Sequence, residues 1–400
     1  MINPTAEELS RWRLRADTLA DDTIAALYAE HSLEAANQVL SALVLNDQTC
    51  PDDLPAAVRH FLFLSGRLPS WADPALIAEG QRVFAERGPL ILLSLVTCSL
   101  AECYALANGV QALYLTHQMD DRHIYRRIYE TAQFIIDTCQ GGGLDPGGRG
   151  LRAIQKVRLM HGSIRHLILT AAPDDHDATS RRFTDVLLGT TWDTQRLGLP
   201  LCYEDQAYTQ LSFSWVTLRS LERFGSPCSA AEQRAWLHLW AVIGHLIGLP
   251  DALLAHTPED GARLYAGIRA HQTRGTRAGR ELTAALSTFV AEKLDSPFLG
   301  RHCTRILLRW LCDDHTLRQV GVRPLSADER WVMDVLRAIT GWVWRDPQGW
   351  LHECLGTALV DKLTKLPREW RRGLFAIPDS LLTGWAAAAV AHANARKRRP

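Results

Sequence analysis

The sequence predicts an all-α protein, and three observations carry this prediction. No stretch alternates apolar and polar residues over enough positions to make a β-strand, whereas apolar residues recur at helical spacing along most of the chain. Capping-box pairs, in which Ser or Thr precedes Glu by three residues, begin several apolar segments. No internal repeat divides the chain, and 400 residues suffice to bury a sizeable core.

Composition narrows the classes of partner and cofactor. The 44 Lys and Arg residues balance 44 Asp and Glu residues, so no net field attracts nucleic acid, and we expect no nucleic-acid partner. Nine cysteines are scattered without a CxxC pair, which argues against a zinc cluster or a disulfide framework. The N-terminus has no basic region followed by an apolar one, so we expect a cytoplasmic protein.

The N-terminal third contains three helical patterns. Thr5 and Glu8 have capping-box spacing and begin the first helix, and Leu33 to Leu45 forms the second. The segment Pro89 to Ala101 is the most apolar of the chain, and its helical spacing continues towards Leu113. It is shorter than the roughly 20 residues that a membrane span requires, so we expect a buried core helix and no transmembrane span. The alternative is a helix that lies on a membrane surface.

The next helix is expected over Asp121 to Thr138, where Arg and Tyr alternate with apolar residues. Glu130 lies one helical turn from Phe134, close to the face that we expect to be buried. Two interpretations follow for its carboxylate. It is either an ion-pair partner for Arg126 or Arg127, or a catalytic carboxylate.

The stretch Gly141 to Leu169 is the one around which we expect the site to be organised. Its glycine-rich turn has no strand before it, which excludes a dinucleotide or phosphate-binding loop. At 100° per residue His161 lies at the edge of an apolar face, with Arg158 and Arg165 just beyond it. Imidazole binds metals and arginine binds carboxylates, so the pattern suits a haem whose iron is bound by His161 and whose propionates are bound by the two arginines. The alternative is a histidine at the boundary of the buried face, with both arginines exposed to solvent. The residues of the expected apolar face are Val157, Met160, Ile164, Leu167 and Ile168.

Helices also account for the remainder of the chain. Glu204 and Asp205 fall in the first turn of the helix expected over Tyr203 to Phe224, where carboxylates complement the helix dipole. Ser229 and Glu232 begin the next helix, on which His238 and His245 share the face opposite the tryptophans. Further helical segments are expected over Thr257 to Glu292 as a pair, over Arg301 to Leu311, from Ser326 with Glu329, and over Leu374 to Ala395 before a basic tail.

Five blocks in order resemble the MpaB-type oxygenase and latex clearing protein (rubber oxygenase) family, over roughly Leu76 to Val322. The blocks are GPLILLSLVTCSLAECYALANG, RRIYETAQFI, GGRGLRAIQKVRLMHGSIRH, GLPLCYEDQAYTQLSFSWVTLRSLERFG and WAVIGHLIGL. The resemblance implies a single large multi-helix domain with globin-like packing around one b-type haem. It places a catalytic domain over residues 71–322, between an N-terminal helical region at 1–70 and a C-terminal helical extension with its basic tail at 323–400.

The same resemblance implies an activity and roles for individual residues. Members of the family cleave carbon–carbon double bonds of polyisoprenoids with dioxygen. Glu130 matches the glutamate of the ET motif, which is similar to a proposed acid–base residue, and Arg158 and His161 match the VRLMH block over the haem. The chain departs from latex clearing proteins on the helix Tyr203 to Phe224, where Leu211 or Ser214 stands in place of their axial histidine.

We therefore predict an oxygenase that depends on haem b and its iron, and that acts with O2 on a small apolar, terpenoid-like or alkene-bearing molecule. Glu130 and Arg158 are the expected catalytic residues, His161 the iron ligand, and Arg158 and Arg165 the partners of the haem propionates. One alternative is a haem-free helical protein that carries a hydrophobic ligand. Another is a non-haem metal enzyme that uses histidines with Glu130 or Asp205, although the chain has no ExxH or HxH pattern.

Overall fold

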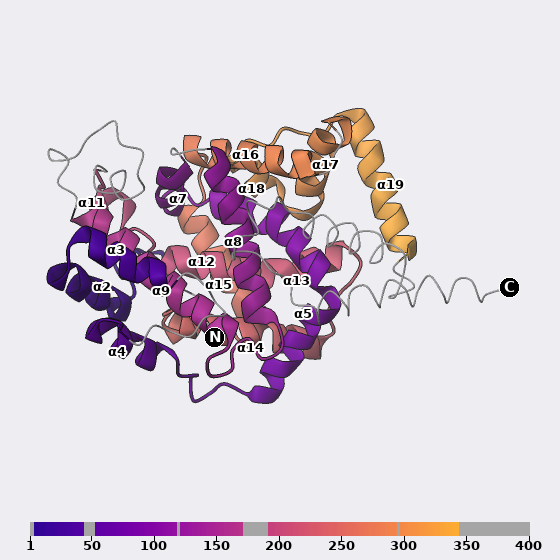
Figure 1. The fold of residues 1–400 in the computed structure, drawn as a ribbon. Helices are drawn as coiled ribbons and strands as arrows, with labels where there is room; N and C mark the ends of the chain where they lie inside the picture. The colour runs from indigo at the N-terminus through magenta and orange to yellow at the C-terminus, as the bar shows by residue number, and fades with distance from the viewer. Residues whose placement is uncertain (1–3, 44–52, 118–120, 171–190, 294–296, 344–400) are drawn as a thin grey trace.

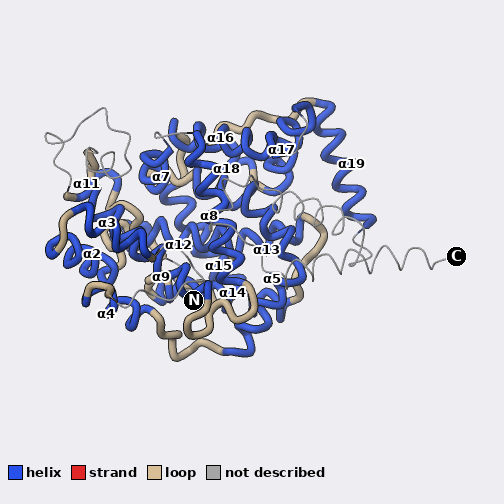
Figure 2. Tube along the Cα trace, in the orientation of Figure 1, coloured by secondary structure: helices blue, strands red, loops and turns tan. Residues whose placement is uncertain are grey.

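The computed structural model describes residues 4–43, 53–117, 121–170, 191–293 and 297–343, and in these ranges the chain is helical (Figures 1 and 2). No strand occurs among them; Leu106 and Thr273 form an isolated antiparallel bridge. The predicted all-α fold is confirmed. In chain order the helices are α1 (Ala6–Trp12), α2 (Thr18–Glu30), α3 (Leu33–Ala42), α4 (Ala56–Ser65), α5 (Pro74–Ser94), η1 (Leu95–Ser99), α6 (Leu100–Tyr104), α7 (Gly109–His117), α8 (Asp121–Cys139), α9 (Arg149–Leu169), α11 (Thr194–Leu197), α12 (Tyr203–Phe213), α13 (Trp215–Arg223), α14 (Ala230–Leu246), η3 (Asp251–Leu253), α15 (Pro258–Gln272), α16 (Arg277–Lys293), α17 (Pro297–Leu311), α18 (Asp314–Gln319) and α19 (Ala327–Val343).

The apolar segment predicted at Pro89 belongs to a longer helical run. Asp73 caps α5 through bonds from the backbone N–H groups of Ala75 and Leu76, and the helix passes through Pro89 into η1, a π-helical turn, and then α6. By length and composition alone the run Pro74–Tyr104 is sufficient to cross a membrane, but most of its apolar window is buried inside the protein. A core helix of this kind agrees with the sequence-based expectation.

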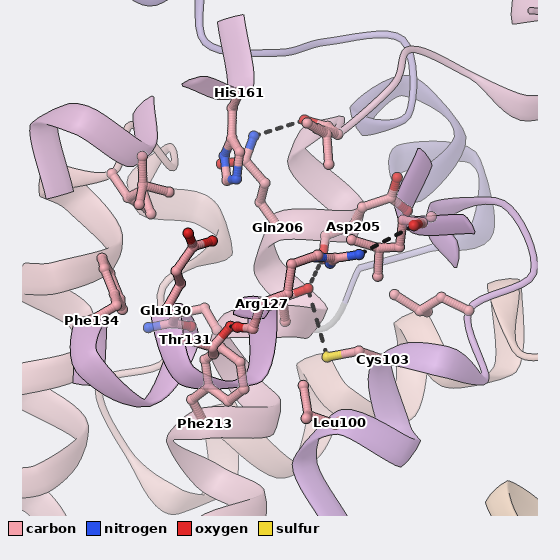
Figure 3. Close-up of a pocket in the computed structure, with 18 of the residues that line it drawn as sticks. Leu100, Cys103, Arg127, Glu130, Thr131, Phe134, His161, Asp205, Gln206 and Phe213 are labelled. Atoms are coloured by element: carbon pink, nitrogen blue, oxygen red, sulfur yellow. Dashed lines mark hydrogen bonds between the residues drawn. The ribbon is translucent and has the colours of Figure 1, made fainter. Parts of the chain in front are cut away.

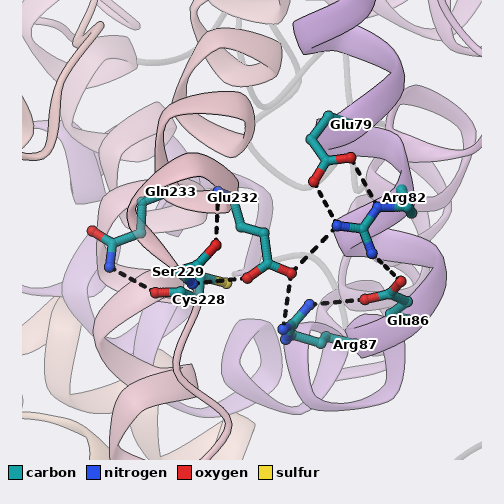
Figure 4. A network of polar contacts seen from close by, with 8 residues as sticks. All are labelled: Glu79, Arg82, Glu86, Arg87, Cys228, Ser229, Glu232 and Gln233. Carbon is teal, nitrogen blue, oxygen red and sulfur yellow. Dashed lines mark hydrogen bonds and ion pairs between the residues drawn. The ribbon is translucent and has the colours of Figure 1, made fainter.

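Helix α5 packs along α14, and charged side chains surround one end of their contact (Figure 4). Glu232 completes the capping box with Ser229 at the start of α14, and its carboxylate also meets Arg87 of α5 at 3.1 Å. The helices approach closely because Gly80 has no side chain: a Cβ there would lie 2.7 Å from the carbonyl oxygen of Ala235. The cap and the ion pair therefore fix the same helix pair.

Two buried arginines attach α9 to α2. Arg158 donates Nε to Asp17 Oδ2 at 2.7 Å and Nη2 to Asp17 Oδ1 at 2.8 Å, and Arg165 Nε donates to Asp21 Oδ1 at 2.8 Å. Arg165 is 1% exposed and Arg158 7%. Apolar residues of α2, α4 and α9 form a second, smaller hydrophobic cluster beside these pairs.

The sequence-based helix pattern differs from the structure at three places. The expected helix Tyr203 to Phe224 breaks at Ser214 into α12 and α13, and the apolar helix ends at Tyr104 before α7 begins. On α9 the predicted face is rotated, because Arg158 and Arg165 are buried while Met160 is 48% exposed. Paired arginines are buried here because each finds a carboxylate, which periodicity cannot reveal.

Some predictions lie outside the described residues or stay untested. The helix expected over Leu374 to Ala395 and the basic tail fall in the range that the structure does not describe. The division at 1–70, 71–322 and 323–400 stays a prediction. The capping boxes at Thr5 and Ser229 are confirmed, and at Ser326 the reciprocal bonds with Glu329 are present as expected.

Replacing Asp17 by Asn tests the attachment of α9. The substitution preserves the shape at the N-terminus of α2 but leaves the Arg158 guanidinium buried without a counter-charge, so we expect a loss of about 3–5 kcal/mol of unfolding free energy. Urea titration followed by circular dichroism measures it. The matched control is Glu7→Gln, whose partner Arg11 is 64% exposed by side chain, and which should change stability by less than about 1 kcal/mol. Equal effects of the two substitutions would contradict this account.

Candidate active site

A cavity of about 260 Å³ lies between α6, α7, α8, α9, α12 and α14 (Figure 3). Its walls are mostly apolar. Polar side chains enter from α8, α9 and α12, among them Arg127, Glu130, His161 and Asp205. Apolar walls with a few converging polar groups are the usual form of a small-molecule site. The apolar residues of the lining include Leu100, Leu113, Phe134, Phe213, Trp240 and Ile243.

His161 projects from α9 into this cavity (Figure 3). Its Nδ1 is buried and has no hydrogen-bond partner among the described residues. Burial, followed by the positive charge of Arg165, lowers the pKa of His161 to about 4. The imidazole is therefore neutral near pH 7, so it offers a nitrogen lone pair that a metal ion can accept.

Helix α8 supplies the opposing polar groups. Arg127, Glu130, Thr131 and Phe134 share one helical face and all line the cavity. Arg127 Nη1 donates to the carbonyl oxygen of Leu113 at 3.1 Å, which keeps the guanidinium at the wall. Figure 3 shows the Glu130 carboxylate extending towards His161. The structure thus brings together two of the four predicted site residues, Glu130 and His161.

The other two, Arg158 and Arg165, are not among the residues that line the cavity. Both are engaged elsewhere: Arg158 Nη1 also donates to the carbonyl oxygen of Leu246 at 2.9 Å, and Arg165 Nη1 to that of Leu201 at 3.1 Å. With Asp17 and Asp21 as their counter-charges, their positions are those of structural ion pairs. Arg127 is an arginine that does reach the cavity, although the sequence drew attention to it only as a partner for Glu130.

Helix α12 presents Asp205, Gln206, Thr209, Gln210 and Phe213 to the cavity. Leu211 and Ser214, which stand where the family's axial histidine is expected, are buried but are not part of the lining. The Ser214 hydroxyl instead donates to the carbonyl oxygen of Gln210 at 2.8 Å. The cavity-facing positions of α12 therefore offer amides, a hydroxyl and a carboxyl group, and no imidazole.

The acidic residues at the start of α12 are more deeply buried than the sequence suggested. Glu204 is 0% exposed and Asp205 7%, so neither acts only as a solvated partner of the helix dipole. Gln272 of α15 donates to Glu204 Oε2 and to Asp205 Oδ1, each at 2.8 Å. The sequence signal was only two adjacent acids after Cys202, and burial could not be derived from it.

A non-haem metal site finds no support in the described part of the chain. No group of three or more His, Cys, Asp or Glu residues is arranged there to hold a metal ion. His238 and His245 share a face of α14, as predicted, but both pack edge-on against Trp71. His245 Nδ1 also lies 3.3 Å from Asp251 Oδ1, and neither histidine lines the cavity.

Over the residues that the structure describes, the fold and the site define an all-helical protein with an apolar cavity and a neutral histidine in its wall. Residues 81–344 match the family model described as "ER-bound oxygenase mpaB/B'/Rubber oxygenase, catalytic domain", which is more than half of the chain. The chain belongs to this oxygenase family. The family resemblance read from the five sequence blocks is therefore confirmed, and the predicted class of enzyme, an oxygenase, agrees with it.

The chain is similar to a known rubber oxygenase in sequence and to a solved latex clearing protein in fold. The rubber oxygenase of Streptomyces sp. (strain K30) is 25% identical over 300 residues, which cover 71% of this chain and 66% of the relative. The structure of latex clearing protein LCP in the closed state has a TM-score of 0.68 and 21% identity, and the match covers 95% of this chain and 91% of that one. This second likeness shows a shared fold.

Gly109 allows α7 to approach the buried carboxyl group of Asp205. A Cβ at position 109 would lie 2.9 Å from Asp205 Cγ, so we expect Gly109→Ala to cost about 1–3 kcal/mol of unfolding free energy. Gly267→Ala in α15 is the matched control, because its Cβ would be no closer than 3.4 Å to Pro4 and the helix interior favours alanine by about 0.5–1 kcal/mol. Thermal unfolding should show opposite signs; a stabilised Gly109→Ala variant would contradict this packing.

Proposed function

We propose that this protein is a haem b-dependent oxygenase that acts with O2 on a small apolar molecule, terpenoid-like or otherwise alkene-bearing, with oxidative cleavage of a carbon–carbon double bond as its reaction. The observation that carries the proposal is the buried, unpartnered Nδ1 of His161 in an apolar cavity. A buried polar atom without a partner costs free energy, so a ligand that satisfied this nitrogen would be stabilised in the cavity. Membership in an oxygenase family supports the reaction class.

The residues of the cavity fit the donor requirements of a haem. His161 would hold the iron through an imidazole nitrogen, because a neutral imidazole is a common ligand of haem iron. Arg127, rather than Arg158 or Arg165, is the arginine in the lining and would neutralise a propionate. The cavity volume of about 260 Å³ is small for this group, so we expect binding to displace flexible wall side chains such as Met160.

The haem would supply the activation of dioxygen, and the remaining tasks fall to the chain. Phe134, Phe213 and Trp240 would bind the apolar substrate and exclude water from it. Glu130 projects into the same space and would orient the substrate or accept a proton from it.

Replacing His161 by Ala tests the ligand assignment. We expect the variant purified from haem-replete cells to lack the Soret band of the wild-type protein, because the imidazole that would hold the iron is gone. Absorption spectra before and after dithionite and carbon monoxide make the measurement. His256→Ala is the control, since His256 is exposed and does not line the cavity. A normal haem spectrum in His161→Ala would show that another residue binds the iron.

Replacing Glu130 by Gln separates catalysis from cofactor binding. We expect a wild-type Soret band but a loss of about 100-fold or more in turnover, as is typical when an acid–base group is removed. Oxygen consumption with an alkene-bearing terpenoid is the measurement. Retention of full turnover would remove Glu130 from the mechanism.

A second candidate function is a haem-free carrier of a hydrophobic ligand. It is favoured by the small cavity and by the lack of histidine among the α12 residues that line it. Wild-type protein that remains colourless after haem is supplied, yet releases an apolar compound on denaturation, would establish this function. The same result would overturn the oxygenase proposal.

A further inference from the structure

Beside the cavity, four side chains of α12 and α15 form a buried group that we call the carboxyl cluster: Glu204, Asp205, His271 and Gln272. Asp205 contributes to the cavity wall, whereas His271 is 17% exposed by side chain. The cluster thus extends from the cavity towards the surface. Neither haem binding nor the role given to Glu130 accounts for it.

Hydrogen bonds connect the members of the cluster, with the Gln272 amide between the two carboxyl groups. Gln272 Nε2 donates to Glu204 Oε2 and to Asp205 Oδ1, both at 2.8 Å, so the two carboxyl oxygens are separated by no more than the span of one bridging water. Glu204 Oε1 lies 2.6 Å from His271 Nδ1. On the outer side, His271 Nε2 lies 3.2 Å from the hydroxyl of Ser10, an exposed contact.

The charges around the cluster favour a retained proton. Two carboxylates bound to one amide in a buried place repel each other, so they do not both ionise readily. Burial raises the pKa of Glu204 to about 8 and also raises that of Asp205, against the opposing effect of Gln272. The positive charge of Arg13, whose Nε lies 3.8 Å from Glu204 Oε2, offsets the effect of burial on the Glu204 pKa only in part.

The neighbouring histidine and thiol are neutral as well. Burial, Arg13 and Arg274 lower the pKa of His271. The Cys202 thiol, also beside Asp205, is kept neutral because burial raises its pKa.

We infer that the carboxyl cluster is a proton path: Glu204 and Asp205 store a proton beside the cavity, and His271 replaces it from solvent. Asp205 releases its proton to a group in the cavity, and Glu204 returns one to Asp205 through a bridging water, since the Gln272 amide binds both carboxyl groups without relaying a proton. His271 takes up a proton from solvent at Nε2 and gives its Nδ1 proton to Glu204, and a flip of the imidazole then turns the protonated nitrogen back towards Glu204, so no proton is created or lost. The use of the proton in turnover rests on the proposed oxygenase function, but its storage and exchange do not.

Infrared spectroscopy of the purified full-length protein tests the path directly. At pH 7 we expect a C=O stretching band of a protonated carboxylic acid, which disappears as the pH is raised through about 8. Glu204→Gln and Asp205→Asn should each remove or shift this band. Absence of the band in the wild-type protein would overturn the inference, whether or not the protein binds haem.

The rate of deuterium exchange tests the role of His271. On transfer to D2O, His271→Gln should retain the carboxylic acid band but slow its isotope shift by about a hundredfold, because glutamine preserves a hydrogen bond without relaying a proton. His256→Gln, the same substitution at an exposed histidine, should exchange at the wild-type rate. Equal rates in all three proteins would exclude His271 as the entry point.

Stability gives an independent measurement that needs no substrate. Since the folded protein binds the Glu204 proton more tightly than the unfolded chain does, the unfolding free energy should fall as pH rises from about 4.5 to about 8. In Glu204→Gln this decline should be smaller. If the two pH profiles are parallel, Glu204 does not hold a proton in the folded state.

Discussion

The ion pairs between α9 and α2 determine the direction of His161. Arg158 precedes His161 by about one helical turn, and Arg165 follows it by about one turn. Both arginines form ion pairs at the start of α2, Arg158 with Asp17 and Arg165 with Asp21. These bonds fix the rotation of α9 about its own axis, and therefore which residues face the cavity. Because an unpaired guanidinium in this place would be costly, the geometry of the site and the stability of the fold depend on the same contacts.

This dependence explains what the sequence could and could not predict. The capping boxes and most of the helices follow from local patterns, and the structure reproduces them among the residues that it describes. The family blocks are local patterns as well, and the family model confirms them. The rotation of α9 about its axis does not follow from a local pattern, because Asp17 lies 141 residues before Arg158 and no spacing rule connects them. With the partner unknown, an arginine beside an apolar face is naturally interpreted as solvated or as a propionate ligand. Only tertiary contact shows it to be a buried pair.

The start of α12 shows the same limit for acidic residues. Glu204 and Asp205 in a first helical turn satisfy the helix dipole, which is a sufficient local explanation. Their burial arises from residues distant in sequence: Gln272 and His271 of α15 cover them, and Arg13, just after α1, lies beside Glu204. A pair of acids whose burial is set by two other segments acquires proton affinity that no local pattern predicts. The carboxyl cluster is therefore a property of the fold rather than of a motif.

The π-helical turn η1 has a comparable effect on the apolar wall. A π turn holds an extra residue, so the helix after it is rotated by about 100° relative to an unbroken α-helix. Leu100, Cys103 and Tyr104 consequently line the cavity. Glu102, the charged residue of this apolar segment, is directed instead to Tyr208 at 2.8 Å and Thr316 at 3.0 Å. The Glu102 carboxyl group is thus kept out of this wall. The wall contributes the thiol of Cys103 and the phenol of Tyr104, and burial raises the pKa of both, so they stay neutral. The other ionisable groups of the lining come from α8, α9 and α12.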